Sequence, residues 1–304
     1  MSLGLAPATL PSPEVAALSL GPITLHAYAL CILAGIMAAV WITQRRLSAR
    51  GGQDGVVVDI ALWAVPAGII GARIYHVITT PDPYFGPQGE LVDALKIWNG
   101  GLGIWGAVAG GAIGAWIACR RYDVPFLTLG TAIAPALPVA QAVGRWGNWF
   151  NNELYGGPTD LPWALEIHRW DAGAGRAVTD ASGQAEVLGT FHPVFLYESL
   201  FCLVLAVLLL LLERRLPDLA PGQLFGAYVA GYPVGRVFLE LMRTDEAEVV
   251  LGQRLNVWTS LVVMGLGVLI WVACGRRRAS STKDAADEGG DSGRLTMRDQ
   301  RVTR

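Results

Sequence analysis

The chain has 304 residues, and its 25 acidic and 23 basic residues give a formal net charge of −2 at neutral pH. Charged residues make up 16% of the chain and hydrophobic residues 53%, whereas a soluble domain carries about 25% charged residues. This composition excludes a soluble globular enzyme, a disordered chain and a nucleic-acid-binding protein with a basic face.

Seven apolar segments are long enough to cross a membrane, since a span takes about 20 mostly apolar residues. We predict an all-α polytopic membrane protein with seven transmembrane helices in one membrane domain over residues 1–274. The tail over 275–304 is polar and charged, which predicts disorder. The predicted spans cover residues 23–43, 56–78, 97–119, 124–144, 194–212, 223–241 and 255–274.

Arginine pairs follow alternate spans, and this alternation predicts the orientation of the chain. Links on the cytoplasmic side of a membrane carry an excess of Lys and Arg. The N-terminus is therefore predicted outside and the C-terminus in the cytoplasm, with a small external loop or head over 145–193, between spans four and five. The basic links hold Arg45-Arg46, Arg120-Arg121, Arg214-Arg215 and Arg276-Arg277-Arg278.

The third predicted span is rich in glycine. Gly106, Gly110 and Gly114 recur every four residues, so they line one helix face with small residues and favour close packing on a neighbouring helix. Gly100 and Gly101 open the span. For this pair, irregular backbone close to a ligand is the alternative to packing.

Several charged side chains fall inside predicted spans, where they are costly and usually face a cavity or a partner. Tyr232, Arg236 and Glu240 share one helix face, which fits either a structural ion pair or part of a ligand pocket. A planar guanidinium group binds phosphate through two hydrogen bonds. We therefore predict a polar pocket that opens toward the outer leaflet and holds an anionic phosphate. The charges in the outer half of the bilayer are Arg73, Arg145, Glu198, Arg236 and Glu240.

The cysteines and histidines give weaker signals. The four cysteines lie in apolar runs without metal-ligand spacing, and neither a metal nor a cofactor is predicted. His26, His76 and His192 lie near the outer ends of spans, where a structural hydrogen bond and a catalytic role are both open. His168 lies in the predicted head and is expected to be solvated.

Residues 144–156 read Gly-Arg-Trp-Gly-Asn-Trp-Phe-Asn-Asn-Glu-Leu-Tyr-Gly. This run resembles the signature of the prolipoprotein diacylglyceryl transferases. Further stretches fit the same family in the same order, so the resemblance extends from residue 21 to residue 274. These stretches are 25–28, 71–73, 98–102, 192–198 and 232–240.

The resemblance implies a multi-pass transferase of the bacterial plasma (inner) membrane, with an active site toward the outer leaflet. It would move the diacylglyceryl group of phosphatidylglycerol to the lipobox cysteine thiol of a prolipoprotein signal peptide, forming a thioether and releasing glycerol phosphate. Its partners would be these two substrates and membrane lipid, with no nucleic acid. The implied catalytic residues are Arg145, Glu153, Arg236 and Glu240, and the implied substrate-binding residues are Arg145, Asn148, Gly156, Tyr28, Arg73, Glu198 and Tyr232.

The charge pattern fits this chemistry, because a thiol that attacks a glyceryl carbon leaves negative charge on a departing phosphate, which arginines stabilise. The thiol, whose ordinary pKa is about 8.5, has to become a thiolate. Related members of the family carry a histidine where this chain has Trp105, and one relative carries an aspartate where it has Thr131. The family's base therefore does not transfer. Two ways of activating the thiol stay open. The arginines alone lower its pKa, or one of Glu153, His26 and His192 acts as a base.

Two other functional classes are alternatives. A transporter or channel for a small anionic solute is typically built from internal repeats with helices broken at mid-depth, and the sequence shows no convincing repeat. Another lipid-headgroup transferase would typically hold a metal through acidic clusters, and the spans contain no Asp-rich motif. Both alternatives are therefore weaker than the diacylglyceryl transferase.

Overall fold

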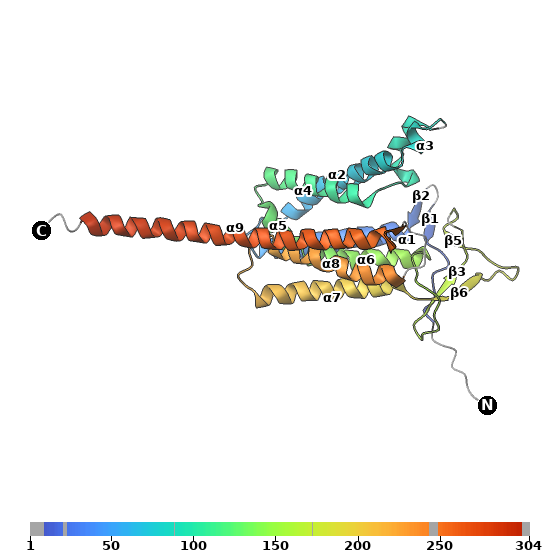
Figure 1. Cartoon of the computed structure of the whole chain (residues 1–304). Coiled ribbons are helices and arrows are strands. Elements are labelled where there is room, and N and C mark those ends of the chain that lie inside the picture. Colours follow the sequence, from blue (N-terminus) through green and yellow to red (C-terminus); the bar gives the residue numbers. More distant parts are fainter. Residues whose placement is uncertain (1–8, 21–22, 88, 172, 243–248, 300–304) are drawn as a thin grey trace, which may run out of the picture. The chain divides into compact units, whose positions relative to one another are not determined.

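The structure is a computed structural model that describes residues 9–20, 23–87, 89–171, 173–242 and 249–299. It divides into two compact units (Figure 1). The first unit consists of Met1–Met37 and Ala134–Arg304, and the second of Ala38–Ile133. Helix α1 (Ala27–Ser48) begins in the first unit and ends in the second.

The first unit is built on four further helices that pack in chain order. α6 (Ala136–Phe150) packs on α7 (Val194–Arg215), α7 on α8 (Gln223–Met242), and α8 on α9 (Leu255–Asp299). The core between α7 and α8 is apolar, as expected from their hydrophobic sequences. Its buried members are Ala134, Leu205, Leu209 and Leu224.

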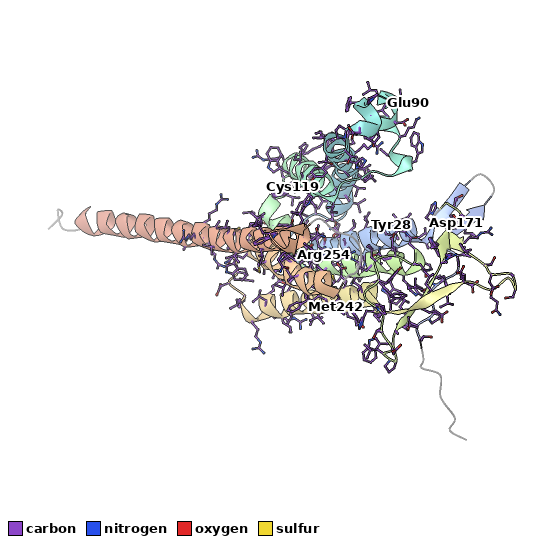
Figure 2. The ribbon with its side chains drawn as sticks, turned by 45° about the vertical axis from the view of Figure 1, so that its right-hand side comes forward. Tyr28, Glu90, Cys119, Asp171, Met242 and Arg254 are labelled. Carbon is purple, nitrogen blue, oxygen red and sulfur yellow. The ribbon has the colours of Figure 1, made fainter. Side chains whose placement is uncertain are left out.

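Short antiparallel hairpins accompany these helices. β1 (Ala17–Leu20) pairs with β2 (Ile23–His26), and β7 (Val249–Val250) pairs with β8 (Gln253–Arg254). In the segment 151–193, which we call the head, the pairs are β3 (Leu165–His168) with β6 (Val187–Phe191) and β4 (Trp170–Asp171) with β5 (Arg176–Ala177). Figure 2 labels Asp171 in the head.

The chain before β1 is held by side-chain hydrogen bonds from the end of α6 and the start of the head. Trp149 Nε1 donates to the carbonyl of Pro11 at 3.1 Å, and Asn152 Nδ2 donates to that of Pro13 at 3.0 Å. Asn152 Oδ1 also accepts the backbone N–H of His168 at 3.1 Å. The expectation that His168 is solvated is wrong, because its side chain is 5% exposed.

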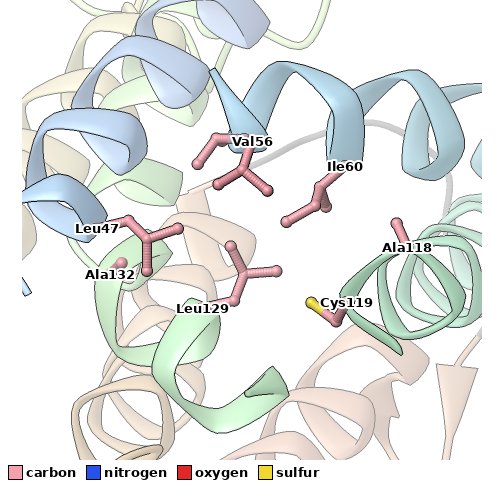
Figure 3. Packing of buried hydrophobic residues seen from close by; sticks show 8 residues of the cluster. Leu47, Val56, Ile60, Ala118, Cys119, Leu129 and Ala132 are labelled. Atoms are coloured by element: carbon pink, nitrogen blue, oxygen red, sulfur yellow. The ribbon is translucent and has the colours of Figure 1, made fainter. Parts of the chain in front are cut away.

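The second unit holds the remaining helices. They are α2 (Val56–Thr79), α3 (Asp82–Phe85), the 3₁₀ turns η1 (Leu91–Leu95) and η2 (Ile97–Asn99), α4 (Ile104–Arg121) and α5 (Phe126–Ile133). Figure 3 shows the apolar core in which α2, α4, α5 and the end of α1 meet. Its labelled members are Leu47, Val56, Ile60, Ala118, Cys119, Leu129 and Ala132.

The all-α membrane class is confirmed. Among the described residues, α1, α2, α7 and Leu255–Ala279 of α9 are long and apolar enough to cross a membrane, and α5 with α6 adds up to one broken span. α4 and α8 do not qualify in this way. α4 contains four glycines and ends on two arginines, while α8 carries an arginine and a glutamate. Seven spans, their orientation and an external head stay predictions.

Two predicted spans differ from the observed helices. Span 97–119 begins at Ile104 instead, because η2 and residues 100–103 precede the α-helix. Span 124–144 is broken between α5 and α6, where Pro135 has no N–H to continue a helix. Arg46 Nε donates to the carbonyl of Ala132 at 2.9 Å, so a side chain replaces part of the lost helical bonding.

Two other boundaries lie later than predicted. The loop 145–193 starts later because α6 continues to Phe150, which places Arg145 inside the helix. The composition of 275–304 predicts a disordered tail, whereas the backbone of α9 stays helical to Asp299; residues 300–304 lie outside the described residues. Once formed, a helix propagates readily through residues with good helix propensity. This applies to the Arg, Ala, Lys and Glu residues of 276–288, and it does not apply to Gly289, Gly290 and Gly293.

The predicted glycine face of α4 is confirmed as a packing surface. A Cβ atom at Gly106 would overlap the carbonyl of Gly71, and one at Gly110 would overlap the carbonyl of Ala67. The backbones of α2 and α4 therefore approach so closely that only hydrogen fits at these positions. This is the close approach that small residues allow between membrane helices.

The substitution Gly106→Ala should lower the free energy of unfolding by about 1–3 kcal/mol, because the added methyl group overpacks the α2–α4 contact. The matched control is Gly265→Ala in α9, where a Cβ would meet no atom within 4 Å. This control should be neutral or stabilising by about 0.5–1 kcal/mol. Unfolding in detergent, followed by tryptophan fluorescence, measures both, and equal losses would contradict the packing argument.

Candidate functional site

Charged side chains from three helices of the first unit converge on one carboxylate. Arg145 of α6 pairs with Glu198 of α7, with Nη2 and Oε1 2.7 Å apart. Arg236 of α8 approaches the same carboxylate, with Nη1 3.3 Å from Oε2. The hydroxyl of Tyr232, one turn before Arg236, donates to Oε1 at 3.0 Å. Three sequence-predicted residues of α6 and α8 therefore meet at Glu198 of α7.

The burial of Glu198 makes its contacts with the two arginines important for stability. The Glu198 side chain is 2% exposed, while those of Arg145 and Arg236 are 25% and 19% exposed. A buried carboxylate without partners would be strongly unfavourable, whereas opposite charges and hydrogen bonds compensate it. Glu198 in turn holds the two guanidinium groups close together, which their mutual repulsion would otherwise oppose.

A second buried carboxylate extends this cluster. Glu240, 1% exposed, accepts from Arg236 Nη2 at 3.3 Å and from Arg254 Nε at 2.8 Å. Asn256 Nδ2 donates to the same carboxylate at 2.9 Å. Arg254 and Asn256 are not among the site residues predicted from the sequence. In the sequence, Arg254 is one charge in the link between two predicted spans. The sequence feature that could have indicated these two residues is an Arg and an Asn two positions apart at the start of an apolar segment.

A recess adjoins the cluster and is lined by residues of the motif and of α7. Asn148 and Asn151 both donate through Nδ2 to Glu153 Oε1, at 2.9 and 3.1 Å. Asn148 is buried and Glu153 is exposed. The recess is too narrow in this structure to admit a water molecule. Its lining residues are Arg145, Asn148, Leu154, Val194, Phe195 and Glu198.

The backbone beside this recess is unusual. Asn152 and Leu154 have φ angles of 51° and 58°, and a left-handed conformation is uncommon for a bulky residue such as leucine. Strained backbone of this kind is often found at active sites and ligand clamps. The strain therefore supports assigning a functional role to the segment that carries Glu153.

Gly156 allows its loop to approach two neighbouring segments closely. A Cβ at this position would come within 2.9–3.1 Å of atoms of His192, Val194 and Met242. Glycine therefore lets this loop contact both the start of α7 and the end of α8, where Figure 2 labels Met242. Gly156 therefore lies next to Val194, which lines the recess, and its place beside the substrate stays a prediction.

Tyr28, at the start of α1, packs on the helix that carries the first arginine of the cluster. Its ring lies against the backbone of Gly147, where a Cβ would be 2.5 Å from Tyr28 Cδ2. The side chain is also partly open to the surroundings, since the residue is 39% exposed. Tyr28 therefore lies next to the motif, and its contact with substrate stays a prediction.

Arg73 lies in the second unit, where its guanidinium group is engaged with backbone carbonyl groups. Nε donates to Ala94 at 2.9 Å, and Nη1 donates to Gly100 and Gly101 at 2.7 and 3.0 Å. Nη2 donates to the carbonyl of Asp93. In this arrangement Arg73 organises the loop between α2 and α4, and its role as a phosphate ligand stays a prediction.

The same loop has irregular backbone at the Gly-Gly pair, while a ligand close to it stays a prediction. Gly100 and Gly101 have φ angles of 83° and 72°, which glycine adopts without strain. A Cβ at Gly101 would crowd both Arg73 Nη1 and His76 Nε2. The second glycine is therefore needed for the arginine to reach the backbone of this loop.

A surface ion pair also lies in this loop. Lys96 donates a hydrogen bond to the Asp93 carboxylate, which raises the pKa of the Lys96 ammonium above its ordinary value. Ion pairs at exposed positions contribute little to stability. The backbone carbonyl of Asp93, which accepts from the buried Arg73, is therefore the more consequential contact of that residue.

The candidate bases differ in their surroundings. His192 Nδ1 lies 3.2 Å from the hydroxyl of Tyr197. His26 is exposed in β2. Glu153 accepts a hydrogen bond from Asn148, and Asn148 lines the recess beside Arg145. Of these three residues, which all lie in the described part of the chain, Glu153 is the one whose side chain has a hydrogen bond to a side chain that lines the recess.

Trp105 and Thr131, the two positions at which the sequence is expected to depart from related proteins, lie in the second unit. Trp105 is 46% exposed near the start of α4, and its indole nitrogen is a donor only. The hydroxyl of Thr131 donates to the carbonyl of Leu127 at 3.0 Å, an interaction internal to α5. Neither side chain is a base at neutral pH, so the proton acceptor has to be sought elsewhere.

Comparison with known proteins identifies close similarities. A family model described as prolipoprotein diacylglyceryl transferase matches residues 15–273. A phosphatidylglycerol–prolipoprotein diacylglyceryl transferase of Streptomyces griseus subsp. griseus is 52% identical over 271 residues, which cover 89% of this chain and 79% of the relative. Phosphatidylglycerol–prolipoprotein diacylglyceryl transferase 2 of Streptomyces coelicolor is 54% identical over 267 residues, which cover 88% of this chain and 80% of the relative. That of Paenarthrobacter aurescens is 51% identical, with 92% and 89% covered.

The substitution Glu198→Ala should lower the free energy of unfolding by about 3–5 kcal/mol, because it leaves two partly buried arginines without their shared carboxylate. The matched control is Glu186→Ala, which removes an exposed carboxylate 3.4 Å from Arg169. An exposed pair of this kind contributes about 0–1 kcal/mol. Denaturant unfolding in detergent compares the two variants, and a loss at Glu198 no larger than at Glu186 would contradict the electrostatic argument.

Proposed function

This chain belongs to the prolipoprotein diacylglyceryl transferase family, and we propose on that basis that it acts on phosphatidylglycerol and a prolipoprotein. The cysteine thiolate of the lipobox attacks a glyceryl carbon, a carbon–sulfur bond forms, and the carbon–oxygen bond to the phosphate breaks. The products are a thioether-linked diacylglyceryl protein and glycerol phosphate. The observation that best supports this function is the convergence of Arg145 and Arg236 on Glu198.

The two arginines suit the leaving group of this reaction. Negative charge gathers on the phosphate as the carbon–oxygen bond breaks, and guanidinium groups already in place stabilise that charge without reorganising. Glu198 holds both groups together before the lipid arrives. The phosphate then has to share or take over hydrogen bonds that Glu198 accepts in this structure.

Activation of the thiol is the second requirement. The positive charge of nearby arginines favours a thiolate, and a general base accelerates proton removal. We assign this base to Glu153, because Asn148 links it to the recess that Arg145 also lines. The hydrogen bonds from Asn148 and Asn151 fix the orientation of its carboxylate.

We further propose the seven-span arrangement in the bacterial plasma membrane, with the site toward the outer leaflet and the head outside. The alternation of basic links supports this orientation. Both substrates would reach the site from within the membrane, which fits charged residues near one end of the spans. The transporter and the other headgroup transferase are not favoured, since the similar proteins carry the diacylglyceryl transferase name.

Transfer of radiolabel from phosphatidylglycerol to a lipobox peptide tests the function directly. Wild-type protein in vesicles should label the peptide, and a peptide with serine in place of the acceptor cysteine should stay unlabelled.

The substitution Arg145→Ala should reduce the rate of label transfer by about 10²–10³-fold, because it removes a group that stabilises the negative charge developing on the phosphate. The control Arg176→Ala changes an exposed arginine of β5 and should retain activity. Normal turnover of Arg145→Ala would remove Arg145 from the mechanism.

The substitution Glu153→Gln should reduce the rate by about 10²-fold at neutral pH, because the amide oxygen still accepts hydrogen bonds but takes up no proton. The loss should shrink toward a pH of about 9, since the acceptor thiol ionises by itself near its ordinary pKa of about 8.5. The control is Glu14→Gln, at an exposed position before β1. A loss that is independent of pH would argue against Glu153 as the base.

A further inference from the structure

The two oxygens of Glu240 have different partners. Oε1 accepts from Arg254 Nε at 2.8 Å and from Asn256 Nδ2 at 2.9 Å, while Oε2 accepts from Arg236 Nη2 at 3.3 Å. The other terminal nitrogen of Arg236, Nη1, donates to Glu198. The guanidinium group of Arg236 therefore lies between two carboxylates, and the position of one of them is set by residues from β8 and α9.

We propose that Arg254 and Asn256 are positioning residues for diacylglyceryl transfer, acting on the phosphate-binding Arg236 through Glu240. This inference rests on the proposed function. Glu240 is buried and lies one turn after Arg236 on α8, so its charge acts strongly on that guanidinium. Arg254 and Asn256 hold Oε1 and offset part of this charge, which keeps Arg236 available to a phosphate on its Glu198 side.

The chain path supports this role. Leu251 and Gly252 form the turn between β7 and β8, with φ angles of 51° and 76°. Two consecutive positive φ angles characterise the two-residue type I′ hairpin, and for leucine this conformation is strained. The strained turn returns the chain so that Arg254, labelled in Figure 2, reaches Glu240 of α8. Such strain is typical of segments with a functional constraint.

The test is a double-mutant cycle in the radiolabel assay, with kcat and KM for phosphatidylglycerol measured on the full-length protein in vesicles. Arg254→Met should lower kcat/KM by about 10–100-fold, because a small misplacement of the Arg236 guanidinium group reduces the rate. Arg254→Lys should restore most of this loss, because it returns the positive charge. The matched control is Gln253→Met, at the exposed neighbouring position, which should behave as wild type.

The double variant Arg254→Met with Glu240→Gln separates positioning from a structural role. If Arg254 acts through Glu240, the double variant should be no less active than Glu240→Gln alone. Multiplicative losses, or an Arg254→Met variant within about twofold of wild type, would overturn the inference. Should Arg254→Met not fold, Asn256→Ala in the same cycle decides in its place. An inactive wild-type protein would instead refute the proposed function itself.

Discussion

The arrangement of the site depends on one buried carboxylate between two arginines. Glu198 is almost fully buried, and it is compensated by Arg145, Arg236 and the hydroxyl of Tyr232. Each helix of the α6–α7–α8 series contributes one charge to this contact. Because breaking a buried ion pair leaves an uncompensated charge, the contact fixes the relative register of the three helices as well as the spacing of their guanidinium groups.

A neighbouring apolar core supports that register. Leucines of α7 and α8 pack together, so the helices that carry Glu198 and Arg236 are held by apolar contacts in addition to the ion pairs. The second unit shows a different solution, in which glycines bring two backbones together. Both solutions satisfy the same condition, since helices in a membrane associate through close packing and polar contacts rather than through exclusion of water.

Much of this organisation is predictable from the sequence because it follows from helical periodicity. The shared face of Tyr232, Arg236 and Glu240 and the glycine face of α4 are both matters of spacing along one helix. The role of Arg254 was not predictable in this way, because a turn brings it back to α8 and its partner lies 14 positions earlier. Arg73 shows the same limit, since sequence alone does not reveal that backbone carbonyl groups occupy its donors.

Gly156 has a consequence for the way in which three segments of the first unit meet. With hydrogen as its side chain, this residue lets one loop touch both the first turn of α7 and the last residue of α8. The narrow recess beside Arg145 is lined by Leu154 of the same loop and by Val194 and Phe195 of α7. A side chain larger than hydrogen at Gly156 would therefore force the loop away from both helices at once, and the recess and the end of α8 would be disturbed together.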